Sequence, residues 1–325
     1  MARTRYASDP GLIARMGATM FLMGLLFVGF GTALVVLIDA YAHRHGGSTS
    51  PDVLIIFAAL IGVGTAVASY YWSDKIALRT SGARLVSPDD SADARRLHEI
   101  VDRICALANM PKPRVAIAPT SMPNAFATGR SSKVAVLCAT RGIMAKLDNE
   151  ELEGVLAHEM SHVAHKDVAV MTVASFLGIV AGLLVRFAFY SELFGGGGRG
   201  RGGNNNNQNA LPVVFIVMLV GIVVYAISFL LIRLLSRYRE LAADRAGALL
   251  TGQPSALASA LTKVSGDIAA IPQKDLRKAE PLNAFYFAPA LSGKAGASLA
   301  NLFSTHPSLD RRLRQLSEIS EQLAR

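Results

Sequence analysis

Cysteine and charge are both scarce in this sequence of 325 residues. It holds two cysteines, Cys105 and Cys138, too few for a disulfide framework and not spaced as a CxxC metal knuckle. Charged residues make up 18% of the chain and hydrophobic residues 51%, with a mean hydropathy of +0.35. Soluble domains carry about 25% charged residues, so this composition argues against an ordinary soluble protein and predicts membrane-spanning segments.

Acidic residues are fewer than basic ones, 24 against 33, which gives a formal net charge of +9. Such a surplus of positive charge suits either nucleic acid or the anionic face of a membrane. No basic run is interleaved with aromatic residues, so nucleic acid is the weaker alternative. We therefore expect the lipid bilayer as a partner, and no nucleic acid.

Four stretches are long and apolar enough to cross a bilayer, at about 16–38, 53–72, 169–189 and 211–232. A signal peptide is the alternative for the first, but no small-residue cleavage site stands out, which favours a retained anchor. Arginine and lysine gather in the N-terminal tail, after the second span and after the fourth. Despite Arg199 and Arg201 in the 191–210 loop, the positive-inside rule places these three regions in the cytoplasm.

The spans divide the chain into four parts. Residues 1–74 are predicted to form an N-terminal transmembrane hairpin, and 169–232 a second hairpin. Residues 75–168 and 233–325 are predicted to be two parts of one cytoplasmic domain. The segment "GGGGRGRGGNNNNQN" (195–209) predicts a flexible external loop, because it has too little apolar surface to fold. A glycine-rich phosphate-binding loop is the alternative, but the segment lacks the strand, lysine and hydroxyl of such a loop.

The cytoplasmic parts read as mostly helical with a small β-sheet. Apolar residues at helical spacing predict a helix over 91–110, and 114–119 and 133–140 resemble short strands separated by turn-rich 120–132. Asp148 or Asn149 is expected to cap a helix that begins with acidic residues. Near the C-terminus, "STHPSLDRRLRQLSEISEQLA" predicts a capped helix with Pro307 in its first turn.

Three of the seven histidines lie within "LAHEMSHVAHKD" (156–167). On a helix, His158 and His162 are four residues apart and therefore point the same way. Two imidazoles so placed can hold one Zn²⁺, and Glu159 beside them can deprotonate a zinc-bound water, which is the chemistry of the HExxH pattern. The alternative is a polar helix face with surface histidines.

A catalytic zinc site needs a third protein ligand. His165 is set aside because it lies about 10 Å along the helix axis from His158. Glu240 and Asp244, in "SRYRELAADRAG" (236–247), are four apart and come just after the last span. If spans three and four form an antiparallel hairpin, Glu240 and His162 both stand about 10–12 Å from the bilayer boundary. Glu240 is then the predicted ligand. The pair resembles the ExxxD motif of zinc peptidases with a glutamate ligand, which implies that Asp244 would hold a ligand histidine.

These motifs together resemble the HtpX-type membrane zinc metallopeptidases, relatives of the CAAX prenyl proteases and the Oma-type proteases. The resemblance covers nearly the whole chain and rests on "PNAFATGR" (123–130), "EELEGVLAHEMSHVAHKD" (150–167), "SRYRELAADRAGA" (236–248) and "FSTHPSLDRRL" (303–313). It implies a mainly α membrane protein, with four transmembrane helices and a cytoplasmic zincin-like domain that uses a glutamate ligand. One Zn²⁺ per subunit would be bound by His158, His162 and Glu240, with Glu159 as general base.

The resemblance also assigns residues outside the metal-binding motifs. It implies that His306 lines the active site and stabilises the oxyanion, the alternative being a surface histidine at a helix start. Arg312 would be a structural or carboxylate-pairing group. The strand at 133–140 is expected to be an edge strand that receives an extended substrate, the alternative being an ordinary core strand. The candidate substrate-binding residues are Asn124, Phe126, Val134 and Val136.

The expected function is zinc-dependent endoproteolysis of misfolded or damaged membrane proteins at the cytoplasmic face of a bacterial inner membrane, as part of protein quality control in the stress response. One alternative is processing of CAAX-type termini, although such relatives usually carry more spans. Another is an inactive chaperone or adaptor on the same scaffold. A transporter or pore is disfavoured, because Arg186 is the one charged residue expected inside a span.

Overall fold

The computed structural model describes residues 10–45, 52–168, 210–270 and 306–325, with scattered positions between 170 and 183. The chain divides into two compact units. We call Met16–Ala68 with Met171–Ile232 the helical unit, and Met1–Arg15, Ser69–Val170 and Arg233–Arg325 the sheet unit. The predicted loop 191–210 lies outside the described residues apart from its last position, and so does most of the predicted span 169–189.

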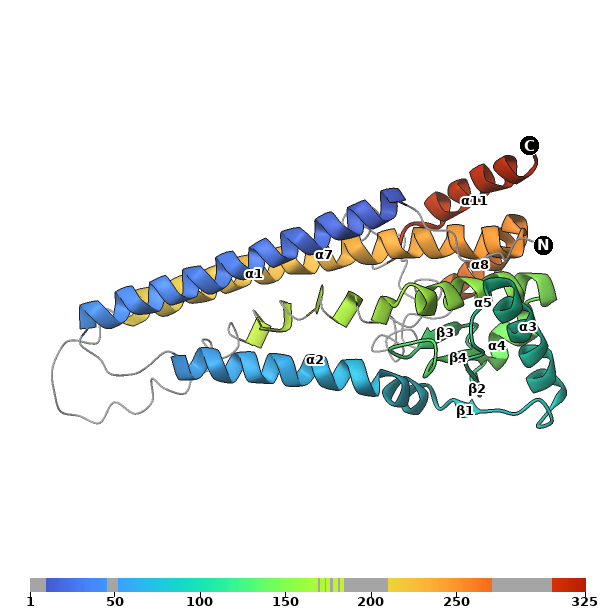
Figure 1. Cartoon of the computed structure of the whole chain (residues 1–325), viewed down its shortest axis with the longest axis horizontal. Coiled ribbons are helices and arrows are strands. Elements are labelled where there is room, and N and C mark those ends of the chain that lie inside the picture. Colours follow the sequence, from blue (N-terminus) through green and yellow to red (C-terminus); the bar gives the residue numbers. More distant parts are fainter. Residues whose placement is uncertain are drawn as a thin grey trace. The chain divides into compact units, whose positions relative to one another are not determined.

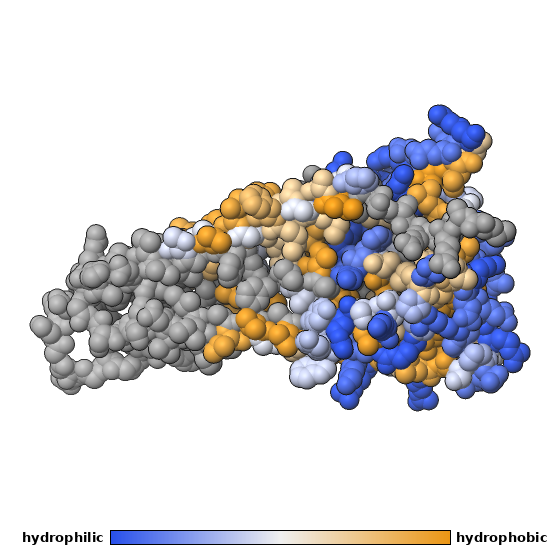
Figure 2. Space-filling view, in the orientation of Figure 1, coloured by the Kyte–Doolittle hydropathy of each residue, from blue (hydrophilic) through white to orange (hydrophobic). Residues whose placement is uncertain are grey.

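Three long helices supply most of the described part of the helical unit: α1 (Pro10–His45), α2 (Asp52–Ser81) and the first half of α7 (Ala210–Thr251). Among the described residues, the stretches Ile13–Phe30 and Met218–Thr251 are long and apolar enough to cross a membrane. Large side chains on both are exposed, Phe21 by 66% and Leu219 by 62%, and the coloured parts of α1 and α7 are largely apolar in Figure 2. Exposed apolar surface of this kind suits contact with lipid. The full four-span arrangement stays a prediction.

A four-stranded sheet forms one layer of the sheet unit (Figure 1). Its strands are β1 (Arg84–Leu85), β2 (Arg114–Ala118), β3 (Ala125–Thr128) and β4 (Val136–Thr140), in the order β1-β2-β4-β3. Strand β4 runs parallel to β2 and antiparallel to β3. It is therefore paired along both sides and buried at every position.

This order corrects two predictions about the sheet. The strand expected at 133–140 is not an edge strand, because β4 lies between β2 and β3. The edge strands are β1 and β3, and β3 lies within a segment predicted to consist of turns. Residues 125–128 are a strand because they pair with β4, from Ala125 opposite Ala139 to Thr128 opposite Val136. A four-residue strand carries too short an alternation to be recognised on its own.

Helix α5 (Asn149–Ala164) packs against β3, against α3 (Ala92–Ala108) and against α8 (Pro254–Ala270). It begins as predicted: Asp148 accepts a hydrogen bond from the backbone N–H of Glu151, and the Glu151 carboxylate accepts one from the N–H of Asp148. Helix α3 also matches its prediction, with Ser91 as N-cap and its apolar side buried. The short α4 (Arg141–Lys146) follows β4. The core they share surrounds α5 on most sides, so twelve of its residues are buried.

The second half of α7 belongs to the sheet unit and crosses α5 closely. Gly247 makes this possible, since a Cβ there would lie 2.9 Å from the backbone nitrogen of His158. The C-terminal helix α11 (Leu309–Leu323) packs on α8. Its N-cap is Ser308, so Pro307 precedes the helix and does not occupy its first turn as predicted.

Candidate metal centre

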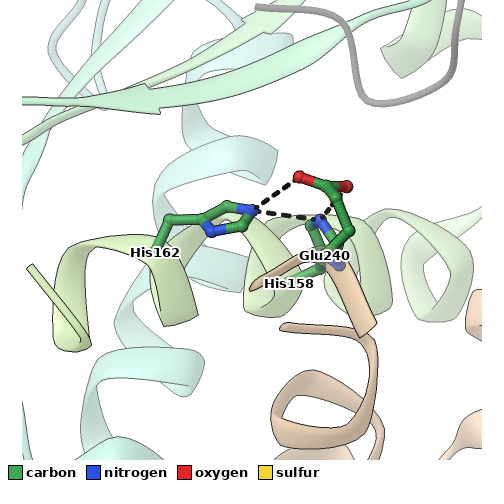
Figure 3. Close-up of side chains that lie close together, drawn as sticks. All are labelled: His158, His162 and Glu240. Carbon is green, nitrogen blue, oxygen red and sulfur yellow. Dashed lines mark hydrogen bonds and ion pairs between the residues drawn. The ribbon is translucent and has the colours of Figure 1, made fainter. Parts of the chain in front are cut away.

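Two histidines of α5 face each other across one helical turn. His158 and His162 have their Nε2 atoms 3.3 Å apart and their rings edge to face, with centroids 5.0 Å apart (Figure 3). His158 is buried, whereas the side chain of His162 is 16% exposed. The helical spacing of four residues produces this pairing, as the sequence predicted.

Glu240 reaches the same point from α7. Its Oε2 atom lies 3.6 Å from His158 Nε2, and its Oε1 atom lies 3.5 Å from His162 Nε2 (Figure 3). Donor atoms held about 2.0–2.2 Å from one tetrahedral ion are about 3.3–3.6 Å from each other. The two imidazoles and the carboxylate therefore fit a divalent metal ion in both spacing and donor chemistry.

His158 is held from its other ring nitrogen by a buried ion pair. Its Nδ1 atom lies 2.9 Å from Asp244 Oδ1. Arg312, from α11, donates to both oxygens of Asp244, from Nε at 2.7 Å and from Nη2 at 2.6 Å. Asp244 and Arg312 are 0% and 1% exposed. A carboxylate on Nδ1 fixes the ring in the tautomer that leaves Nε2 free for a metal.

His162 has an equivalent pair that sequence reasoning missed. Its Nδ1 atom lies 2.5 Å from Asp167 Oδ2, which also accepts a hydrogen bond at 2.7 Å from Arg239 Nη2. Asp167 lies five residues after His162, a spacing that would place it on another face of a continuous helix. The sequence contains no evident signal for the local break that brings it back.

His306 lies against the third donor. Its Nδ1 atom is 3.1 Å from Glu240 Oε2, and the residue is buried. Burial alone would raise the pKa of Glu240, but His306 and His158 outweigh it and hold that pKa well below its usual range. Burial likewise works to lower the pKa of His158, but Asp244 and Glu240 raise it to about 9. The carboxylates thus make a pocket that favours positive charge.

Glu159 stands beside the cluster and touches the sheet. It is 6% exposed, and its Oε2 atom accepts a hydrogen bond at 3.1 Å from the backbone N–H of Ala127 in β3. Burial raises the pKa of Glu159, although His158 and His162 work in the opposite direction. A buried carboxylate whose pKa is raised toward neutrality can both accept and return a proton.

Other residues proposed from the sequence lie elsewhere. His165 is exposed at the C-terminal end of α5. Phe126 packs in a small apolar cluster with Ala77, Ala116 and Cys138. The remaining candidates for substrate binding lie in or beside the sheet: Asn124, whose backbone pairs with Thr140, partly buried Val134 before β4, and buried Val136 within it.

A helix bearing HExxH, crossed by a second helix that brings a glutamate to the two histidines, is an arrangement typical of the metallopeptidase class. Comparison with protein families agrees. Residues 91–320 match the family described as Peptidase family M48, and the chain belongs to this family. It is accordingly a metalloprotease, and the resemblance stated from the sequence is confirmed.

Two relatives match along nearly their whole lengths. The chain is 55% identical to Protease HtpX homolog 1 of Streptomyces coelicolor over 321 residues, which cover 99% of this chain and 97% of the relative. It is 47% identical to Protease HtpX homolog of Moorella thermoacetica, covering 99% and 98% of the two chains. Among solved structures, S. mikatae Ste24p matches with a TM-score of 0.51 and 17% identity, over 89% of this chain and 67% of that one. This last likeness concerns the fold alone.

Proposed function

We propose that the chain is a membrane-integral zinc endopeptidase in which His158, His162 and Glu240 bind one Zn²⁺ and Glu159 is the general base. The observation that carries the proposal is the spacing of the three donor atoms, 3.3–3.6 Å from one another. The alternative for the histidines, a polar helix face in water, does not explain why His158 is 1% exposed.

The chemistry follows from the donor set and its neighbour. A bound Zn²⁺ would lower the pKa of a water molecule and polarise the scissile carbonyl group. Glu159 accepts the proton of the attacking water on its carboxylate and returns it to the nitrogen of the leaving amine. The N–H of Ala127 holds one carboxylate oxygen, which leaves the other oxygen to carry the proton.

His306 has two uses in this proposal. Through Nδ1 it holds the Glu240 carboxylate, at 3.1 Å. When the ring is protonated on both nitrogens, its Nε2 atom would donate to the oxyanion of the substrate, as the family resemblance implies. Arg312 acts at a distance from the substrate, because its partner is Asp244.

Edge strand β3 is the better candidate for binding an extended substrate. Its residue Ala127 contacts Glu159, so a peptide paired along β3 would pass beside the general base. We propose that such peptides come from misfolded or damaged membrane proteins. The apolar helices support a membrane location, and the basic residues near the predicted span ends support a cytoplasmic site in a multi-pass protein of the bacterial inner membrane.

The test compares wild type, Glu159→Gln and Glu240→Ala in detergent, with Glu318→Ala on an exposed face of α11 as control. Zinc content and cleavage of an unfolded membrane protein are measured on the same samples. Glu159→Gln should keep the zinc and lose cleavage by about 10²–10⁴-fold. Glu240→Ala should lose both, and Glu318→Ala neither. The proposal fails if Glu240→Ala keeps full zinc and activity, or if chelation leaves cleavage intact.

A further inference from the structure

A break in the helix directly follows the two histidines. Helix α5 ends at Ala164, and Lys166 adopts a left-handed backbone conformation with φ of 56°. Helical hydrogen bonding resumes beyond it, from the N–H of Val170 to the carbonyl of Lys166. In an uninterrupted helix, a residue five positions on is rotated by about 140° and displaced by about 7.5 Å. The break is what turns Asp167 back toward His162.

Asp167 is shared between a histidine and an arginine. Its Oδ2 atom accepts from His162 Nδ1 at 2.5 Å and from Arg239 Nη2 at 2.7 Å. The side chains of Asp167 and Arg239 are 5% and 11% exposed, so water competes little for this pair. The attraction between the two charges is therefore screened much less than in an ion pair on the surface.

Asp167 and Arg239 lie on either side of one predicted membrane hairpin. Asp167 comes immediately before the predicted span 169–189, and Arg239 follows the predicted span 211–232. Arg239 is also the residue before Glu240 on α7. An ion pair between these two positions joins the start and the end of one membrane-hairpin segment at the place where His162 and Glu240 meet.

We propose that Asp167 and Arg239 form a clasp that positions His162 and sets its separation from Glu240. The proposal rests on the function proposed above. Asp167 and Arg239 are positioning residues, since they act on the metal through His162 and through the backbone of α7. His162 needs this support because its ring is partly exposed, whereas His158 is enclosed on all sides. A ring lacking a partner on Nδ1 can turn away and can change tautomer.

The experiment measures Zn²⁺ affinity of the full-length protein in detergent by competition with a chelator. Asp167→Ala should bind Zn²⁺ about 10–100-fold more weakly than wild type. Asp167→Asn, which keeps an acceptor for His162 but loses the charge that Arg239 needs, should recover part of that loss. Asp310→Ala, an exposed aspartate in the first turn of α11, should bind as wild type does.

Two further readouts separate positioning from folding. Ligand-field absorption of bound Co²⁺ should change in Asp167→Ala and not in Asp310→Ala, because only the former alters the donor geometry. Thermal unfolding of the metal-free proteins identifies any variant that fails to fold, in which case Asp167→Asn carries the test. The clasp also predicts non-additivity: Asp167→Ala with Arg239→Gln should bind Zn²⁺ no more weakly than Asp167→Ala alone.

The outcomes distinguish this proposal from the proposed function. Wild-type Zn²⁺ affinity in folded Asp167→Ala, together with loss of zinc in Glu240→Ala, would overturn the clasp and leave the site assignment standing. Zinc retained in Glu240→Ala would overturn the site assignment itself. Fully additive losses for Asp167→Ala and Arg239→Gln would show that the two residues do not act as one unit, and would also overturn the clasp.

Discussion

The two ends of α5 are held in different ways. At its N-terminal end a capping box closes the helix, and the Glu151 carboxylate also accepts hydrogen bonds from Ser259 and Lys263 of α8 at 2.6 Å. Every residue from Glu151 to Ser161 is buried. At the C-terminal end the chain leaves the helix through left-handed Lys166, and His162 is partly exposed.

This difference separates what stabilises the fold from what shapes the site. His158 is buried between α5, α7 and the Asp244–Arg312 pair, so its position depends on the whole sheet unit. His162 lies near the C-terminal end of α5, where its ring is partly exposed. There the contacts with Asp167 and Arg239 hold the ring in place of core packing. The free energy of unfolding should therefore fall most for substitutions around His158 and less for substitutions near the break that follows His162.

The largest loss is expected at Arg312, which is 1% exposed. Arg312→Ala removes the cation that donates to both oxygens of buried Asp244, and breaking a buried ion pair in this way typically costs about 3–5 kcal/mol. Thermal unfolding in detergent measures this loss, with Arg314→Ala on the exposed face of the same helix as control. Unfolding of Arg312→Ala at the temperature of the control would contradict the role assigned to the pair.

A smaller loss is expected at Gly247, where α7 crosses α5. Gly247→Ala places a methyl group 2.9 Å from the backbone nitrogen of His158, so one helix must move, at a cost of about 1–3 kcal/mol. Because Glu240 is on the displaced helix, zinc affinity should fall as well. The matched control is Gly266→Ala, where nothing lies within 4 Å of the added Cβ. Equal zinc affinity in the two variants would count against a close crossing.

Glu151 provides a prediction that depends on pH. Burial alone would raise its pKa, but hydrogen bonds from Lys263, Ser259 and the N–H of Asp148 outweigh burial and lower the pKa. A carboxyl group whose pKa is lowered by folding adds stability above its unfolded pKa, and this contribution is lost as the pH falls through the folded pKa. Glu151→Gln should thus destabilise by about 1–2 kcal/mol at neutral pH.

The difference between Glu151→Gln and wild type should remain constant above the unfolded pKa of a glutamate, about 4.3, and shrink as the pH falls below it through the lower pKa of the folded state. Glu150→Gln is the matched control, because Glu150 occupies the same first turn and is exposed. Thermal unfolding is followed across this range for all three proteins. A difference that stays constant at acid pH would show that the charge of Glu151 does not contribute.

The smallest effect is expected at the break itself. Lys166 holds a left-handed backbone conformation, φ 56°, that disfavours a side chain by about 1 kcal/mol. Lys166→Gly should therefore leave stability unchanged or raise it by up to about 1 kcal/mol, while Lys166→Val should lower it. If both variants unfold at the same temperature, the left-handed conformation at residue 166 would be in doubt.

The sequence was most informative where geometry is local. Helical spacing predicts that His158 and His162 face one way, and the capping residues correctly predict the start of α5. The proximity of Glu240 followed from treating spans three and four as a hairpin, and the structure places its carboxylate within 3.6 Å of both histidines. That these three residues bind the metal stays a prediction.

The features that were not predicted share a physical cause. Each depends on contacts or backbone conformations that a short sequence pattern does not contain. Residues 125–128 form strand β3 because they pair with β4. The same pairing makes β3, and not β4, an edge of the sheet. Asp167 reaches His162 only because Lys166 is left-handed. Glycine or asparagine would have signalled such a conformation, but lysine does not.

X-ray absorption at the zinc edge of zinc-loaded Glu159→Gln tests the central claim most directly, since this variant should bind zinc without cleaving itself or its substrates. We predict one zinc per chain, with two imidazoles and only nitrogen and oxygen donors at about 2.0–2.2 Å. In Glu240→Ala this signal should be lost. A sulfur donor at about 2.3 Å, or fewer than two imidazoles around the zinc, would contradict the assignment of His158, His162 and Glu240.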